Sequence, residues 1–278
     1  MSSLIATVLG SVFIITVNIL NWRKTNAIQL ADQLITLISV SNLLMELVKV
    51  TGYPIKFLNE SYFSTKLEHP VTFLFMFLLS CSHWFSSWLC VHFCLKIVSS
   101  RHRLYTRLQR CFHESTEWIM VLSVLGSLLC TIAIIFSETS VYPSNKTFGG
   151  SPVNNTLYLM NIWHACTIYG IVSSFGFLLS SASAVTIITS LHRHLKKMQD
   201  HVRGLQGSSV SVHVRAAKTV VSILFLNVLL YVALVITLIE DDEYIFMLTI
   251  CHILGSVILI MGNKKLCKTL IHIFSRFT

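Results

Sequence analysis

Long apolar runs constrain the fold of this chain more than any other feature of its sequence. A helix needs roughly 20 predominantly apolar residues to cross a hydrocarbon core of about 30 Å. Only 12% of the 278 residues are charged, whereas soluble domains carry about 25%. The sequence therefore predicts an all-α membrane protein, a single bundle of seven transmembrane helices within residues 1–278. We place these helices approximately at residues 4–20, 30–50, 70–97, 117–137, 161–190, 216–239 and 244–262.

The short segments between the runs leave no room for a soluble catalytic domain. The sequence contains no phosphate-binding glycine loop, no nucleophile elbow and no pair of intramembrane carboxylates, so we expect neither an enzyme nor a cofactor site. His192 and His194 raise the question of a zinc site. Side chains two residues apart on a helix face different directions, and no acidic or thiol ligand lies near them in sequence to complete the coordination. We therefore expect no metal ion, and we expect contacts with membrane lipid but not with nucleic acid.

Basic residues are concentrated on one side of the predicted bundle. Most of the 21 Lys and Arg residues lie in segments 23–24, 96–110, 193–218 and 264–276, whereas the acidic block Glu240–Glu243 lies on the other side. Segments rich in Lys and Arg face the cytosol, which puts the N-terminus outside and the C-terminus inside. Three Asn-X-Ser/Thr sequons fall in the loops assigned to the outside, and we expect glycosylation there. These sequons are at Asn59, Asn145 and Asn154.

Aromatic and ionisable residues inside the runs are candidates for a ligand pocket. Trp84 and Trp88 are four residues apart and share one face of a helix, where two indoles form a flat platform for hydrophobic or cationic ligands. The alternative is that they pack against other helices or at the lipid interface. Glu46 lies in an apolar run, where an ionisable group usually faces the bundle interior. It can accept a protonated amine of a ligand, or it can form an ion pair with Lys49 three residues later.

Two further polar pairs are spaced by four residues, Asn227 with Tyr231 and His252 with Ser256. The members of each pair share a helix face. Small-molecule sites are mostly apolar and contain a few polar groups, so both pairs are candidates to line a pocket. Polar residues in membrane bundles also commonly bridge helices. We therefore include Asn227, Tyr231 and His252 among the candidate ligand-binding residues, with both roles open.

Short polar and aromatic motifs occur in order along the runs. They are Phe13-Ile14 with Val17-Asn18 and Trp22; Asp32-Gln33; Trp84 with Leu95-Lys96-Ile97; Ser190-Leu191 with Arg193-His194 and Met198; His213 with Ala216 and Lys218-Thr219; and Ser256 with Gly262-Asn263, Lys265 and Leu266. In this order they resemble the bitter taste receptor (type 2 taste receptor) family of G-protein-coupled receptors. The Asp-Arg-Tyr and Asn-Pro-x-x-Tyr signatures of rhodopsin-like receptors are absent from the sequence.

The resemblance implies a multi-pass receptor of the plasma membrane that binds bitter small molecules among the outer halves of the third, fifth, sixth and seventh helices. It implies ligand contact at Trp84 and activation of a gustducin-like heterotrimeric G protein at the inner face. Membrane topology alone also requires basic residues at that face, but neutral histidines contribute little to topology. The residues assigned to coupling and activation are Lys96, Arg193, His194, His213, Lys218 and Asn263.

The sequence departs from the family pattern at several positions. Asn42 stands where an arginine is common in the second helix, and Gly255 stands where a histidine usually precedes the serine of the seventh. Asn227 lies near a family tyrosine of the sixth helix. A related chemoreceptor of the vomeronasal type 1 kind is one alternative, and a seven-span transporter or channel is a second from a different class. Signalling that depends on a G protein would separate a receptor from a transporter.

Overall fold

The computed structural model describes residues 2–26, 29–58, 63–98, 103–139, 167, 169–171, 173–190, 192–193, 207–239 and 245–277. Every regular element within these ranges is an α-helix, which confirms the predicted all-α class. The helices are α1 (Ser2–Thr25), α2 (Leu30–Leu58), α3 (Phe63–Ile97), α4 (Arg103–Glu114), α5 (Thr116–Thr139), α7 (Gly207–Ile239), α8 (Ile245–Gly262) and α9 (Lys264–Phe277). A further apolar helical segment, Tyr169–Ser190, lies between α5 and α7.

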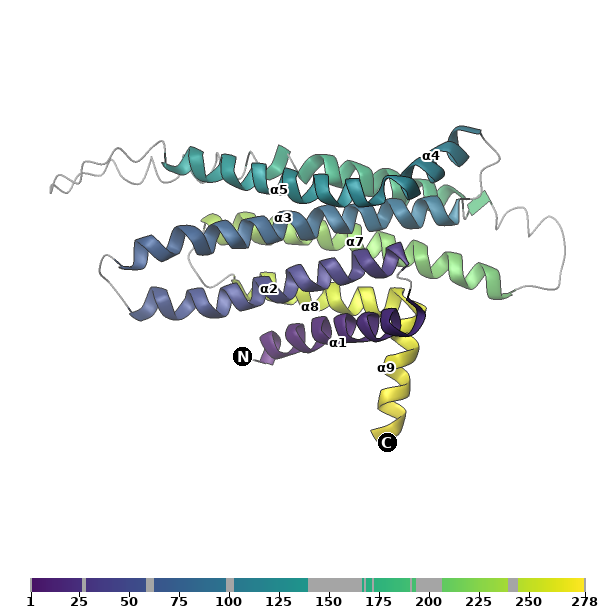
Figure 1. Cartoon of the computed structure of the whole chain (residues 1–278), viewed down its shortest axis with the longest axis horizontal. Helices are drawn as coiled ribbons and strands as arrows, with labels where there is room; N and C mark the ends of the chain where they lie inside the picture. Colours follow the sequence, from purple (N-terminus) through teal and green to yellow (C-terminus); the bar gives the residue numbers. More distant parts are fainter. Residues whose placement is uncertain are drawn as a thin grey trace.

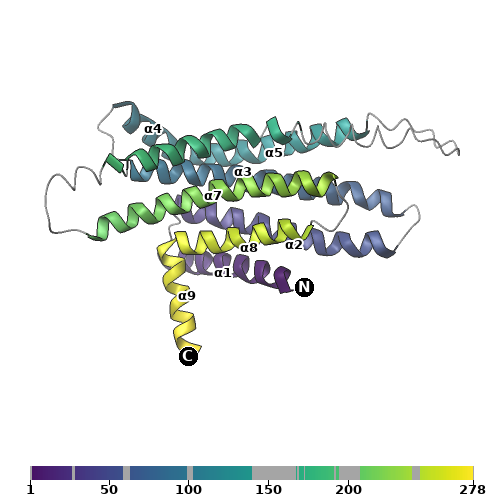
Figure 2. The ribbon, with the colours of Figure 1, turned by 180° about the vertical axis from the view of Figure 1, so that it is seen from behind.

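The long helices run side by side along the longest axis of the molecule (Figure 1). Helix α2 packs against α1 and α3, α3 packs against α5 and α7, and α8 packs against α1 and α7. Figure 2 shows the same bundle from behind, with α7 and α8 lying in front. Two helices depart from the common direction. Helix α4 projects from the end of the bundle, and α9 leaves it at a steep angle (Figures 1 and 2).

Apolar helices of bilayer length dominate the described part of the chain. By length and composition, five helices can cross a membrane, and the count rises to six if α8 and α9 together form one broken span. Within α7, Ala217–Ala233 is a shorter apolar stretch. The described residues thus form a bundle of membrane helices, and the number seven stays a prediction. Several helices extend past the predicted apolar runs, because a run marks only the segment that matches lipid and helical structure continues beyond it.

The surface of α5 shows how lipid reverses the usual pattern of burial. Ser123, Ser127 and Thr131 are spaced by four residues and are buried, whereas the large apolar side chains Leu122 and Leu129 are exposed. A soluble helix would show the opposite arrangement. In lipid the outer surface has to be apolar, and small polar residues allow close packing between helices. Two of the hydroxyls donate to carbonyls within their own helix, Ser123 to Ile119 at 2.7 Å and Thr131 to Ser127 at 2.8 Å, which satisfies their hydrogen bonds.

Helices α4 and α9 were not anticipated by the apolar runs. Both are strongly amphipathic, because their basic and apolar residues separate onto opposite faces. Asn263 lies at the break between α8 and α9, where the chain bends by 98°. Its side-chain Oδ1 accepts a hydrogen bond from the backbone N–H of Lys265 at 3.0 Å, an N-cap that satisfies one of the free donors of the first turn. The predicted end of the last run at residue 262 therefore coincides with a capped start of α9.

Buried apolar side chains form two clusters of different size. The larger lies toward the end of the bundle where α9 begins and draws residues from α1, α2, α3, the Tyr169–Ser190 segment, α7, α8 and α9. Leu89, Ile187 and Val220 are inaccessible to solvent at its centre. The smaller cluster includes Met45, Leu79 and Tyr169. Leu79 and Tyr169 of this smaller cluster also line a cavity.

Candidate ligand cavity

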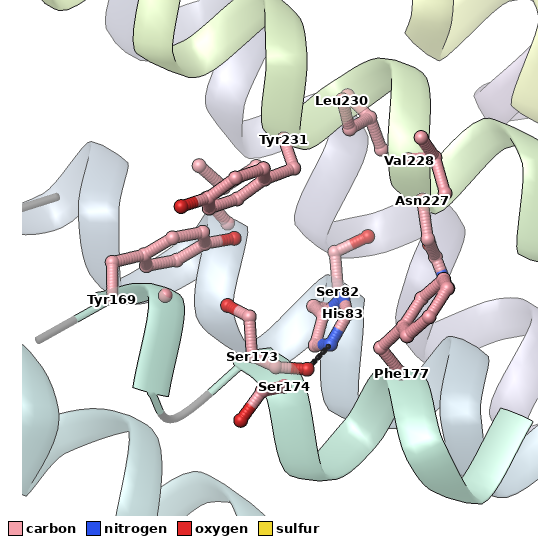
Figure 3. Close-up of a pocket in the computed structure, with 12 residues that line it drawn as sticks. Ser82, His83, Tyr169, Ser173, Ser174, Phe177, Asn227, Val228, Leu230 and Tyr231 are labelled. Carbon is pink, nitrogen blue, oxygen red and sulfur yellow. Dashed lines mark hydrogen bonds between the residues drawn. The ribbon is translucent and has the colours of Figure 1, made fainter. Parts of the chain in front are cut away.

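A cavity of about 350 Å³ opens between α3, the Tyr169–Ser190 segment and α7. Three helices contribute to its wall because each presents one face, with residues spaced by three or four, toward the same space (Figure 3). Its volume falls at the lower end of the range typical of small-molecule sites, about 300–1,000 Å³. The lining residues are Leu79, Ser82, His83, Tyr169, Gly170, Ser173, Ser174, Phe177, Asn227, Val228, Leu230 and Tyr231.

Aromatic rings form much of the cavity wall. Tyr169 and Tyr231 stack on each other, with ring centroids 6.4 Å apart and planes inclined by only 8°. Phe177 lies on the opposite side of the view in Figure 3 and also lines the cavity. Such rings bury large apolar areas. This part of the wall can therefore hold a flat, mostly apolar molecule.

His83 is fixed in the cavity wall by a neighbouring helix. Its Nε2 lies 3.1 Å from the backbone oxygen of Ser173, to which it donates when that nitrogen carries the proton. Gly176 makes this approach possible, since a Cβ at residue 176 would lie only 2.7 Å from His83 Nε2 and 2.9 Å from Ser87 Oγ. A larger residue at position 176 would displace the His83 and Ser87 side chains from these positions.

Asn227 is the unusual polar group of the cavity. It is buried, and its Nδ2 has no hydrogen-bond acceptor among the residues that the structure describes. A buried amide donor without a partner costs about 1–3 kcal/mol. By contrast, the Ser82 hydroxyl donates to Oδ1 of Asn42 at 3.0 Å, and Ser174 donates to the backbone oxygen of Ile171 at 2.6 Å. Among the described lining residues there is no Asp, Glu, Lys or Arg, so the wall carries no permanent charge.

Asn227 and Tyr231 both line this cavity, as their four-residue spacing allowed. The other predicted ligand residues lie elsewhere in the structure. Reasoning from the sequence missed His83, Tyr169, Ser173 and Phe177. His83 carried a signal that could have identified it, because an ionisable residue within an apolar run usually faces the bundle interior or a cavity. The tyrosine and phenylalanine carried none, since aromatic residues also occur throughout lipid-facing surfaces.

Glu46 lies outside the cavity, in a buried ionic cluster between α2 and α8. Its Oε1 accepts a hydrogen bond from Lys49 Nζ at 2.7 Å and lies 2.9 Å from Nδ1 of His252. Lys49 also donates to Thr249 Oγ1 at 3.2 Å. The ion pair with Lys49 was one of the two alternatives for Glu46, and the structure contains it. The Glu46 carboxylate therefore already has a cationic partner, and His252 bridges helices instead of facing the cavity.

Trp84 and Trp88 stack on one face of α3, with centroids 6.3 Å apart, and neither lines the cavity. Trp84 contacts Phe175 at a centroid distance of 6.0 Å, and Trp88 contacts Phe112 of α4 at the same distance. Trp88 also donates from Nε1 to Ser123 Oγ at 2.8 Å. These contacts give Trp88 a packing role that ties α3 to α4 and α5.

A second ionic cluster joins α1, α2 and the junction of α8 with α9. Asp32 accepts hydrogen bonds from Asn263 Nδ2 and from Lys265 Nζ, both at 2.9 Å. Asn18 donates from Nδ2 to Thr36 Oγ1 at 2.9 Å and to the backbone oxygen of Asp32 at 3.3 Å. Asn263, predicted as a coupling residue, thus caps α9 and holds it to α2 at once.

The other predicted coupling residues are only partly described. Lys96, Arg193 and Lys218 are exposed. His213 lies on α7, but its side chain is outside the described part, and His194 lies outside the described residues altogether. The three predicted glycosylation sites, Asn59, Asn145 and Asn154, also fall outside them. Across the described ranges, no group of three or more His, Cys, Asp or Glu is arranged to hold a metal ion.

Comparison with known proteins gives a consistent result along the whole chain. A model of the taste receptor protein (TAS2R) family matches residues 1–277. Taste receptor type 2 member 64 of Pan paniscus is 28% identical over 282 residues, which cover 96% of this chain and 88% of that receptor. Taste receptor type 2 member 43 of Papio hamadryas is 29% identical over 276 residues, and that of Homo sapiens is 28% identical over 275. Each of these two alignments covers 94% of this chain and 87% of the relative.

Proposed function

The chain belongs to the TAS2R family of bitter taste G-protein-coupled receptors, and on this premise we propose that it binds bitter small molecules and activates a gustducin-like heterotrimeric G protein. The family consists of multi-pass membrane receptors, not enzymes. The family match along the whole chain favours this function over the vomeronasal and transporter alternatives considered from the sequence.

The cavity between α3, the Tyr169–Ser190 segment and α7 is the observation that carries the proposed ligand site. It combines apolar and aromatic walls with a few polar groups, which is the composition expected of a small-molecule site. We assign ligand contact to Asn227 and Tyr231, and we add His83 and Tyr169. Trp84 and Trp88 stay candidates for a neighbouring subsite through their stacked rings. Glu46 and His252 act on the ligand only indirectly, by fixing α2 against α8.

Coupling to the G protein is assigned to the opposite end of the bundle. Lys96, Arg193, His194, His213, Lys218 and Asn263 belong to the segments that positive-inside topology places in the cytosol. Ligand binding would shift an existing equilibrium between conformations that differ at this face. Reversing one exposed charge, as in Lys218→Glu, should lower maximal G-protein activation while the ligand concentration for half-maximal response stays the same.

The proposed topology completes the assignment. We propose seven spans over residues 1–278, with the N-terminus outside, the C-terminus in the cytosol and the receptor in the plasma membrane. Glycans at Asn59, Asn145 and Asn154 would then face outward. Epitope tags at the two termini test this orientation, because only an N-terminal tag should be accessible to antibody on intact cells.

A calcium assay tests the function directly. Cells that express the chain with a promiscuous G protein should respond to some members of a panel of bitter compounds. Matched cells that lack the G protein should give no response to the same compounds. Ligand-evoked current in cells without the G protein would contradict the proposal and favour a channel or transporter.

A further inference from the structure

We infer that the cavity selects neutral, compact ring compounds that carry a hydrogen-bond acceptor such as a ketone, lactone or amide oxygen, with Asn227 as the donor that recognises it. The inference rests on the proposed function, since it names the ligand class of the same cavity. It is drawn from the charge, donors and shape of the described lining residues.

The absence of charge in the wall is the first argument. Among the described lining residues none is Asp or Glu, so a protonated amine would find no counter-ion there. The nearest candidate from the sequence, Glu46, is bound by Lys49 at 2.7 Å and lies beside His252. Removing an amine from water without a counter-ion is strongly unfavourable. A cation over an aromatic face recovers only part of this cost, and the Tyr169–Tyr231 stack already covers one face of each ring.

The hydrogen-bond donors of the wall give the second argument. His83 Nε2 is directed at the Ser173 carbonyl, and the hydroxyls of Ser82 and Ser174 already donate to protein oxygens. Among the described lining residues, Asn227 contributes the one buried side-chain donor, Nδ2, that has no acceptor. A ligand oxygen that accepts from Nδ2 would remove the penalty of this unpaired donor. The gain is specific to acceptors, since a hydrocarbon group in the same place would leave the donor unpaired.

The shape of the cavity gives the third argument. A volume of about 350 Å³ suits a compact ligand of one or two rings better than an elongated one. Tyr231 and Phe177 both line the space. Because Asn227 Nδ2 is buried, a neighbouring side chain has to move before the carbonyl oxygen of a flat ring lying against Tyr231 can reach it. The small volume therefore limits both the size of the ligand and the place on it where the acceptor oxygen can lie.

Matched ligands on the unaltered receptor provide the first test, which needs no mutation. Each set contains a bicyclic lactone or ketone, its analogue with a methylene in place of the carbonyl, and an amine on the same ring skeleton. The carbonyl compound should be the most potent in the calcium assay, with the methylene analogue and the amine at least tenfold weaker. Greater potency of the amine across several skeletons would overturn the inference.

Substitution of Asn227 provides the second test. Asn227→Leu keeps the volume but deletes the donor, and it should weaken carbonyl agonists roughly tenfold to a hundredfold while the weak methylene analogue is unchanged. Asn227→Ser, which restores a small donor, should recover part of the loss. Asn227→Asp should improve the response to the amine. Phe225→Leu, at an exposed position of the same helix that does not line the cavity, serves as the matched control, and its ranking of the three ligands should equal that of the unaltered receptor.

Failure of the inference and failure of the proposed function give different results. If Asn227→Leu reaches the cell surface and responds to carbonyl and methylene compounds as the unaltered receptor does, the inference is wrong and the receptor function stands. If the unaltered receptor gives no G-protein-dependent signal to a broad bitter panel, the proposed function fails and the inference falls with it. Surface labelling of an N-terminal tag on each variant separates lost binding from lost expression.

Discussion

Two ionic clusters join α2 to the last two helices, one to α8 and the other to the junction of α8 with α9. They differ in how far their side chains are exposed. In the first, the Glu46 side chain is 0% exposed and that of Lys49 8%, with His252 as a third buried partner. In the second, the Asp32 side chain is 9% exposed and that of Lys265 30%. Both contain a carboxylate on α2. The first cluster is sealed within the membrane bundle, whereas the second lies at its end and is partly open to water.

This difference predicts how strongly each cluster stabilises the bundle. Breaking a buried ion pair leaves a charge without a partner, which costs about 3–5 kcal/mol. At a partly exposed pair, water takes the place of the lost partner and the effect is smaller. The cavity differs from both clusters, because no lining residue among those described carries a permanent charge. Stability and ligand recognition should therefore respond to different mutations.

The largest effect is expected for Lys49→Met. The substitution leaves the Glu46 carboxylate buried beside His252 without its cation, so the free energy of unfolding should fall by about 3–5 kcal/mol. Thermal unfolding of the detergent-solubilised receptor measures this loss. The double variant Glu46→Gln/Lys49→Met removes both charges together and should be clearly more stable than the single variant. Equal stability of the two variants would show that the charge is not the cause.

A smaller effect is expected for Asp32→Ala. It removes the acceptor for Asn263 and Lys265, but Lys265 can remain hydrated, so a loss of about 1–3 kcal/mol is expected. Amide hydrogen exchange should rise in α9 more than in α7, because the hydrogen bonds that hold the junction are lost. Lys264→Met, an exposed neighbour, is the control and should leave exchange in α9 unchanged. A loss as large as that of Lys49→Met would contradict the comparison.

The neutral hydrogen bond between Trp88 and Ser123 should contribute less to the free energy of unfolding than either ionic cluster. Trp88→Phe keeps most of the apolar ring but deletes the donor to Ser123 Oγ, so unfolding should become easier by about 1 kcal/mol. Ser123→Ala removes the acceptor, and the double variant should lose less than the two single losses added together. Additive losses in this cycle would mean that the 2.8 Å contact does not stabilise the bundle.

The smallest change in stability is expected in the cavity itself. Tyr231 is partly exposed at 39%, so Tyr231→Phe should change the free energy of unfolding by no more than about 0.5 kcal/mol. The response to carbonyl agonists should still change, because the hydroxyl lies at the cavity wall. The same thermal unfolding assay, run beside dose–response curves, checks both expectations. A large loss of stability would make Tyr231 a structural residue and remove the distinction between cavity and clusters.

The sequence predicted those features that depend on local spacing. Apolar length predicted membrane helices, of which the described part of the chain contains five or six by length and composition, and a spacing of three residues suggested the pair of Glu46 with Lys49. The third partner, His252, lies 206 residues from Glu46, and no local pattern states which faces of two distant helices meet. The same reason explains why Asp32 and Asn263 were known as motif residues but not as hydrogen-bond partners.

For the cavity, too, the sequence pattern did not show which helix faces meet. The four-residue spacing of Asn227 and Tyr231 put both on one face of α7, but it did not decide between a pocket and a bridge to another helix. The opposite wall comes from α3 and the Tyr169–Ser190 segment, and only their packing shows that His83 and Tyr169 complete it. Helices α4 and α9 were missed because their apolar residues occupy one face of a mostly polar sequence, a pattern that apolar length does not detect.

Photoaffinity labelling tests the central claim, that ligand binds in the cavity and not at the ionic clusters. A carbonyl agonist that carries a small diazirine would be crosslinked to the receptor, which is then digested and analysed by mass spectrometry. The label should fall on peptides that contain Tyr169–Phe177 or Asn227–Tyr231, and excess parent agonist should prevent it. Labelling confined to the peptides of Glu46–Lys49 or His252, prevented by the same agonist, would contradict the account.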